Sequence, residues 1–167
     1  MGPVIFILII LEFFFTSLIL MTLSGITDYL DGFLARKYNL TSLHGKILDP
    51  IADKILITFS LIAISIYLDS FFIACLSALI ISREIWVSGL RDFNSATGNF
   101  GATDVTFLAK FKTTFQILTI FLYLIGFSVN NSLIIFLSDW ILFIAALITI
   151  KTGLDYTQKT NMLGKNS

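Results

Sequence analysis

The chain is organised around two acidic runs. They read Asp28-Tyr-Leu-Asp31-Gly32-Phe-Leu-Ala35-Arg36 and, after eight further residues, Gly45-Lys-Ile-Leu-Asp49-Pro-Ile-Ala-Asp53. On a helix the first run places Asp28, Asp31, Gly32 and Ala35 on one face, and the spacing of four does the same for Gly45, Asp49 and Asp53. Residues 37–44 are polar enough to form a turn. Two helices joined there would point their acidic faces at each other.

Four carboxylates gathered in an apolar setting indicate a cation site. Like charges repel, so the carboxylates would protonate unless cations neutralise them. Two divalent ions carry four positive charges, and ligands made only of oxygen favour Mg²⁺ or Mn²⁺ over zinc. Because two such ions side by side assist in-line displacement at phosphorus, the pattern predicts a two-metal site for phosphoryl-type transfer.

The complete pattern, D-x2-D-G-x2-A-R-x8-G-x3-D-x3-D, resembles the signature of the CDP-alcohol phosphatidyltransferase family. The segments Leu48–Lys54, Arg83–Arg91 and Lys110–Thr114 resemble the bacterial members that use glycerol 3-phosphate. The resemblance covers most of Thr22–Thr114. It implies transfer of the phosphatidyl group from CDP-diacylglycerol to that alcohol, with release of CMP, and it implies a homodimer as one arrangement.

The resemblance also assigns roles within the two runs. Asp28, Asp31 and Asp49 are expected to bind the metals, and Asp53 is the candidate general base and a further metal ligand. The nucleotide site is expected to comprise Asp28, Gly32, Ala35, Arg36 and Gly45. Small side chains would let a nucleotide approach the helix backbones, although close helix packing also explains Gly32 and Ala35.

Basic residues later in the chain are candidates for the acceptor site. Arg83, Lys110 and Lys112 lie in apolar runs, where a charge needs a partner. An anionic alcohol such as glycerol 3-phosphate would supply the counter-charge, with Thr113 and Arg91 as further contacts. The alternatives are an ion pair of Arg83 with Glu84 or Asp53, and one of Arg91 with Asp92.

Composition places the chain in the membrane. It has 167 residues, of which 56% are hydrophobic, a net charge of zero, and a mean hydropathy of +0.91. This length suits one domain, residues 1–167, and neutrality gives no indication of nucleic-acid binding. The single cysteine, Cys75, excludes a disulfide within the chain, and His44, the only histidine, is interpreted as a turn residue. We identify no cleavable signal pattern.

The apolar runs predict an all-α, polytopic membrane bundle of six helices, the first of them shortened. A single helix over Pro3–Arg36 would be about 50 Å long, against a hydrocarbon core of about 30 Å, so we place a turn near Glu12–Phe14. The expected helices are Pro3–Leu11, Phe13–Lys37, Lys46–Tyr67, Phe71–Leu90, Val105–Phe127 and Leu133–Leu154, followed by a polar tail, Asp155–Ser167. For Asp139 one interpretation is a functional intramembrane acid, and the preferred one is a residue near the outer end of its helix or paired with a hydroxyl.

Orientation follows from the eleven lysines and arginines, all of which fall on one side of this arrangement. The positive-inside tendency makes that side cytoplasmic, so the active site would face the cytoplasm at the inner membrane. Two other interpretations stay open: a related transferase that makes cardiolipin or phosphatidylinositol phosphate, and a divalent-cation transporter. A shortened N-terminus, which would impair activity, is a further alternative.

Overall fold

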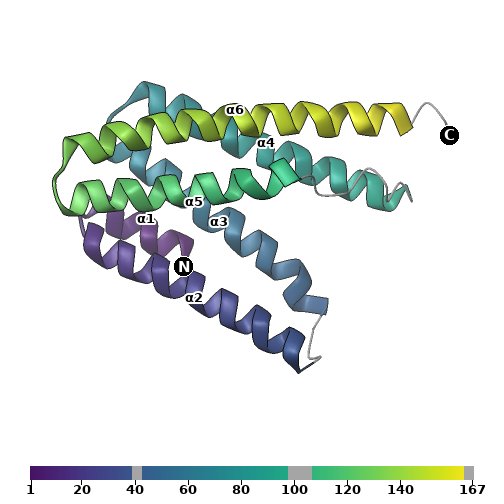
Figure 1. Cartoon of the computed structure of the whole chain (residues 1–167), viewed down its shortest axis with the longest axis horizontal. Helices are drawn as coiled ribbons and strands as arrows, with labels where there is room; N and C mark the ends of the chain where they lie inside the picture. The colour runs from purple at the N-terminus through teal and green to yellow at the C-terminus, as the bar shows by residue number, and fades with distance from the viewer. Residues whose placement is uncertain (39–42, 98–106, 164–167) are drawn as a thin grey trace.

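The computed structural model describes residues 1–38, 43–97 and 107–163. Within these ranges the chain forms helices only, and the predicted all-α bundle is confirmed (Figure 1). The helices are α1 (Gly2–Ile10), α2 (Phe14–Lys37), α3 (Leu43–Tyr67), α4 (Phe71–Ala96), α5 (Phe107–Ser128) and α6 (Ser132–Leu163). The shortened first helix and the turn that follows it are also confirmed.

Three turns at one end of the bundle, on the left in Figure 1, join α1 to α2, α3 to α4 and α5 to α6. Each contains one non-glycine residue with a positive φ angle: Glu12 at 64°, Asp69 at 46° and Asn130 at 52°. The Phe13 amide donates to the Leu8 carbonyl at 2.8 Å and the Glu12 amide to the Ile9 carbonyl at 3.0 Å. A residue in the left-handed conformation turns the chain back, so that the amides after the helix can donate to its last carbonyls. These carbonyls would otherwise have no partner at the helix end.

The helices pack around one apolar core. Helix α6 contacts α5 and α4, α1 contacts α3 and α2, and α3 also contacts α4 and α5. At Gly2 a β-carbon would lie 2.9 Å from Ile55 Cγ2 and 3.1 Å from the Ile55 carbonyl, so the start of α1 lies directly against the backbone of α3. The largest fully buried core side chains are Ile5, Ile9, Leu61, Ile64, Ile80, Ile120, Tyr123, Leu124 and Leu142.

Three described helices contain segments long and apolar enough to cross a membrane: Pro50–Tyr67, Phe71–Ala96 and Ser132–Thr160. Helix α5 contributes a shorter apolar segment, Thr113–Ser128. The outer surface of the bundle carries many large apolar side chains, among them Phe71 and Phe136. An apolar exterior around an apolar core is the arrangement of a bundle that lipid surrounds.

Two predicted helix ends are wrong. Helix α4 continues to Ala96 rather than ending at Leu90, and α6 continues to Leu163, so most of the expected polar tail is helical. Hydropathy falls after Leu90 and Leu154, but the polar side chains beyond them bond across α4 and α6. Asn94 Nδ2, for example, donates to Thr160 Oγ1 at 2.9 Å, and both residues are buried. Helix α3 begins at Leu43, slightly before the predicted Lys46, so Pro50 lies inside it.

Candidate functional site

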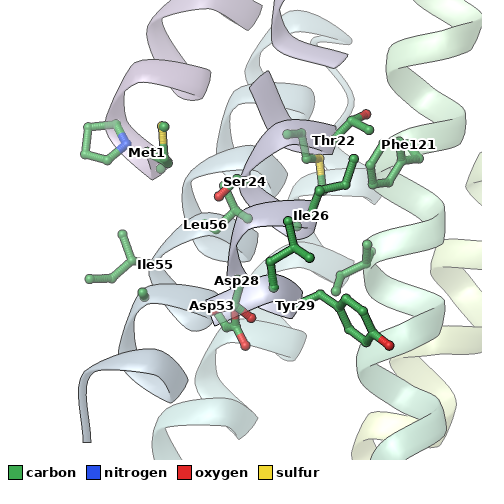
Figure 2. A pocket seen from close by; sticks show the side chains of 17 residues that line it. Met1, Thr22, Ser24, Ile26, Asp28, Tyr29, Asp53, Ile55, Leu56 and Phe121 are labelled. Atoms are coloured by element: carbon green, nitrogen blue, oxygen red, sulfur yellow. The ribbon is translucent and has the colours of Figure 1, made fainter. Parts of the chain in front are cut away.

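A pocket of about 820 Å³ opens between the start of α1, the middle of α2, α3 and α5. Its walls are mainly apolar, and two carboxylates lie among its lining residues, Asp28 from α2 and Asp53 from α3. Figure 2 shows these two side chains near each other at the lower end of the pocket. The structure therefore brings together one carboxylate from each of the two acidic runs.

Helix geometry explains which side chains reach the pocket. On α2 the lining residues Met21, Ser24, Gly25 and Asp28 recur every three or four positions, as expected for one face of a helix. Asp31, one turn further along α2, is exposed and does not line the pocket. Gly32 is half-buried and also lies outside the lining.

The side chain that follows Asp53 on α3 bonds to α4. The Lys54 ammonium, next to Asp53, donates a hydrogen bond to Ser88 Oγ on α4, and that hydroxyl donates to the Glu84 carbonyl oxygen at 2.8 Å. This contact links α3 to α4 beside Asp53. Since adjacent helix residues differ by about 100° in direction, Asp53 points away from Lys54 and toward the pocket that it lines together with Asp28 of α2.

Several predicted site residues lie outside the side chains that the structure describes. They are Ala35, Arg36, Gly45, Asp49, Lys110 and Lys112. Their assignments stay predictions. Among the described residues, no group of three or more His, Cys, Asp or Glu side chains is close enough to hold a metal ion.

The donor chemistry of the pocket nevertheless fits a hard divalent cation. Asp28 and Asp53 offer carboxylate oxygens from two helices, and oxygen is the ligand type that Mg²⁺ and Mn²⁺ prefer. The sequence places Asp49 one helical turn before Asp53 on α3. The composition of this end of the bundle is therefore compatible with the predicted cation site.

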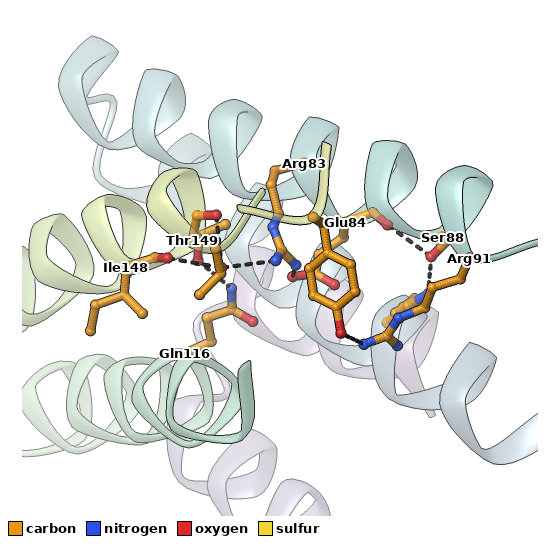
Figure 3. A network of polar contacts seen from close by, with 10 residues as sticks. Arg83, Glu84, Ser88, Arg91, Gln116, Ile148 and Thr149 are labelled. Carbon is orange, nitrogen blue, oxygen red and sulfur yellow. Dashed lines mark hydrogen bonds and ion pairs between the residues drawn. The ribbon is translucent and has the colours of Figure 1, made fainter. Parts of the chain in front are cut away.

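The predicted acceptor residues Arg83 and Arg91 lie in the seam between α4 and α6 (Figure 3). Arg83 is only 7% exposed, and its Nη2 donates to Thr152 Oγ1 at 2.8 Å. Its Nη1 forms an ion pair with Glu84 at 3.3 Å, which confirms one of the alternatives considered for this residue. A β-carbon at Gly153 would lie 3.0 Å from Arg83 Cγ, so the glycine makes room for the arginine stem.

Arg91 has a different partner from the one considered. Its Nη2 donates to the Tyr156 hydroxyl at 2.9 Å, and its guanidinium lies 5.2 Å from the centre of the Tyr156 ring. The Nε atoms of Arg83 and Arg91 are buried and have no hydrogen-bond partner among the described residues. Neither arginine, nor the half-buried Thr113, lines the Asp28–Asp53 pocket.

Sequence comparison identifies the protein family. A family model described as CDP-alcohol phosphatidyltransferase matches residues 1–151. The chain belongs to this family. Among similar curated proteins, one from Wigglesworthia glossinidia brevipalpis is 44% identical over 107 residues, which is 64% of this chain and 59% of that protein. One from Rickettsia bellii is 42% identical, covering 83% and 75%, and one from Haemophilus influenzae is 37% identical, covering 87% and 76%.

All three relatives are named CDP-diacylglycerol–glycerol-3-phosphate 3-phosphatidyltransferase. The chain spans about three fifths of the first relative and three quarters of the other two. The predicted family and the predicted all-α fold are therefore confirmed.

The sequence analysis missed the α6 side of the seam between α4 and α6. It includes Thr152, Tyr156 and Thr160 of α6, and Thr149, about one turn earlier on the same helix, bonds to α5 instead. Thr149 accepts a 3.3 Å hydrogen bond from Gln116 Nε2 of α5. Their spacing of three or four residues is a detectable signal of one polar helix face, but it was hidden because the helix was predicted to end at Leu154.

Proposed function

We propose that this chain transfers the phosphatidyl group of CDP-diacylglycerol to glycerol 3-phosphate, forming phosphatidylglycerophosphate and CMP. The observation that carries the proposal is the pocket that Asp28 and Asp53 share in a membrane bundle of this family. The printed names of the relatives support the two substrates. A pocket at the edge of a lipid-facing bundle suits a donor with acyl tails and a charged head.

In the proposed reaction, the acceptor hydroxyl oxygen attacks the phosphorus attached to diacylglycerol. The bond from that phosphorus to the oxygen of CMP breaks, and CMP leaves with the bonding electrons. Asp53 accepts the proton of the attacking hydroxyl, the role that a positioned carboxylate fills in general base catalysis. The mainly apolar walls of the pocket would exclude water, which otherwise competes as the nucleophile.

Asp28, Asp31 and Asp49, with Asp53, would hold two divalent ions, Mg²⁺ or Mn²⁺. Bound there, the ions would neutralise the diphosphate and the charge that develops on the leaving group. Gly32, Ala35 and Gly45 would admit the nucleotide close to the helix backbones, and Arg36 would bind its phosphate.

The acceptor phosphate would be bound by basic residues of α4 and α5. Arg83 has one carboxylate partner among the described residues, Glu84, and a buried Nε without one, so it retains donor capacity for an anion. Lys112 and Thr113 would add a charge and a hydroxyl, and Lys110 and Arg91 are further proposed contacts. An anionic alcohol supplies the counter-charge that such a cluster needs in an apolar setting.

We further propose a single domain over residues 1–167, an active site on the cytoplasmic side and assembly as a homodimer. The positive-inside tendency supports the orientation, because the three turns at the other end of the bundle contain no lysine or arginine.

The test is CMP release by purified protein given CDP-diacylglycerol, Mg²⁺ and a panel of alcohols: glycerol 3-phosphate, inositol phosphate, phosphatidylglycerol and glycerol. We expect release with glycerol 3-phosphate far above that with the others. If the protein preferred inositol phosphate or phosphatidylglycerol, glycerol 3-phosphate would be the wrong acceptor, but the proposed phosphatidyl transfer would stand. No release with any alcohol, together with Mg²⁺ uptake into proteoliposomes, would favour the transporter.

A further inference from the structure

A second pocket, of about 420 Å³, lies at the end of the bundle away from the Asp28–Asp53 pocket. Its lining consists of Phe72 at the start of α4 and four residues of α6, Phe136, Asp139, Trp140 and Phe143. We call it the aromatic pocket. Its volume falls within the range of about 300–1,000 Å³ that small-molecule sites occupy. Neither the proposed reaction nor the family motif uses any of these residues.

The four α6 residues are spaced at i, i+3, i+4 and i+7, so they form one face of the helix. The Trp140 ring stands nearly perpendicular to its neighbours, at 79° to Phe136 and 89° to Phe143, with 6.3 Å between centres in each pair. Phe72 lies 6.3 Å from Phe143 at 28°. Rings set at right angles present both faces and edges to the space between them, and ring faces attract cations.

Asp139 brings a carboxylate into this aromatic surrounding. The Tyr123 hydroxyl of α5 donates to Asp139 Oδ1 at 2.6 Å, which confirms the predicted pairing with a hydroxyl. A hydroxyl donor does not neutralise a charge. The sequence has no lysine or arginine between Lys112 and Lys151, and Lys151 lies about 18 Å further along α6 at 1.5 Å per residue.

A carboxylate at this depth calls for a cation, and no described side chain is seen to provide one for Asp139. Asp139 lies about 10 Å along α6 from Ser132, at 1.5 Å per residue, which is within reach of lipid headgroups at this end of the bundle. A phospholipid with an ammonium group supplies a cation at that depth, and its acyl chains match the apolar exterior. Phe72, Phe136 and Trp140 are all more than half exposed, so a lipid can reach the pocket from the side.

We propose that the aromatic pocket binds the ammonium headgroup of a zwitterionic phospholipid of the phosphatidylethanolamine kind. The ammonium lies against the ring faces of Trp140 and its neighbours and pairs with Asp139. This function differs from the proposed transfer reaction and does not depend on it, because the pocket shares no residue with the Asp28–Asp53 pocket.

The proposal is tested by native mass spectrometry of the purified protein in detergent with equal amounts of phosphatidylethanolamine and phosphatidylglycerol. We expect the wild-type protein to retain phosphatidylethanolamine several-fold more often. Asp139→Asn, which keeps an oxygen acceptor for Tyr123, and Trp140→Leu should each abolish that preference.

Two control variants make comparable changes, loss of a charge and loss of an aromatic ring, at the same end of the bundle. Asp69→Asn removes a charge from the α3–α4 turn, and Phe71→Leu removes an 85% exposed ring beside Phe72; neither residue lines the pocket. Both should keep the wild-type preference. Equal retention of the two lipids by the wild-type protein, or an undiminished preference in Trp140→Leu, would overturn the proposal even if Asp139→Asn failed to fold.

Discussion

Arg83 Nη2 and Thr152 Oγ1 form a 2.8 Å hydrogen bond that joins α4 to α6 where both side chains are almost fully buried. Thr152→Val keeps the shape of the side chain and removes the acceptor. A guanidinium donor is then left buried without one of its partners, so we expect the free energy of unfolding to fall by about 1–3 kcal/mol. Denaturant titration in mild detergent, followed by circular dichroism, measures the change.

Thr157→Val is the matched control for this substitution. Thr157 accepts a 3.0 Å hydrogen bond from Trp86 Nε1, also between α4 and α6, but at an exposed site. Solvent or headgroups can replace that bond, so its loss should cost less than about 1 kcal/mol. Equal costs for the two valine variants would show that Arg83 does not depend on Thr152.

Asp53→Asn is expected to lose turnover while keeping donor binding. A missing general base lowers the rate by about 10²–10⁴-fold, and the amide oxygen retains some capacity to bind a cation. Asp28→Asn should weaken binding of CDP-diacylglycerol as well. Single-turnover CMP release and donor binding, measured separately, distinguish the two, with Asp69→Asn as a control far from the pocket. If both variants lost donor binding equally, Asp53 would act mainly as a metal ligand rather than as the general base.

Removal of divalent cations should abolish CMP release. Carboxylates grouped at one end of an apolar bundle need counter-charge, and a diphosphate donor adds more negative charge. Activity should vanish with excess chelator and return with Mg²⁺ or Mn²⁺ but not Ca²⁺, whose longer ligand distances and higher coordination number suit a different geometry. Undiminished release in chelator would reject a metal-dependent mechanism.

Arg83 and Lys112 are expected to set the affinity for the acceptor. Loss of a charge-assisted contact costs roughly 1.5–3 kcal/mol, which corresponds to about a ten- to hundred-fold rise in KM for glycerol 3-phosphate. Lys112→Ala and Arg83→Lys should show this rise with little change in the KM for CDP-diacylglycerol. Lys159→Ala, an exposed lysine on α6, is the control. A selective rise in the donor KM would instead place these residues beside the nucleotide.

Glu12→Gly should stabilise the turn between α1 and α2. Glu12 adopts a φ of 64°, in the left-handed region that costs an L-residue roughly 1–2 kcal/mol and glycine almost nothing. Glycine also loses more conformational entropy on folding, which offsets part of this benefit. The net increase in the free energy of unfolding should be about 0.5–1 kcal/mol. Glu12→Val, branched at the β-carbon, should destabilise the protein. Thermal melting in detergent ranks the three proteins, and a lower midpoint for glycine than for glutamate would contradict the argument.

The sequence was sufficient to predict six helices and the turns between them because apolar runs of membrane length leave few alternatives. The spacing of the acidic runs also predicted that α2 and α3 share a site, and Asp28 and Asp53 do line one pocket. The predicted ends of α4 and α6 are wrong because a run of polar residues does not by itself end a helix. There the polar residues are partners for each other, as with Arg91 and Tyr156, so tertiary contacts extend both helices.

The aromatic pocket was also missed, although the signal is visible in the sequence. Phe136, Asp139, Trp140 and Phe143 follow helical spacing, yet each residue alone fits an ordinary aromatic belt at a membrane surface. That this face of α6 lines a pocket becomes visible only with the neighbouring helices in place. Phe72 of α4 completes the lining, and Tyr123 of α5 bonds to the Asp139 carboxylate. Contacts between distant segments of this kind cannot be derived from the periodicity of one helix.

The length of α6 has a consequence for the exchange of its amide hydrogens with water. The helix has 32 residues, which corresponds to about 48 Å, whereas the hydrocarbon core is about 30 Å thick. If its start lies at one membrane surface, its last third extends into the opposite interface and the water beyond. The hydroxyl series from Thr149 to Thr160 then runs from lipid into solvent. Deuterium uptake should therefore rise steeply along these residues, and separation of α6 from α4 should begin at Thr160.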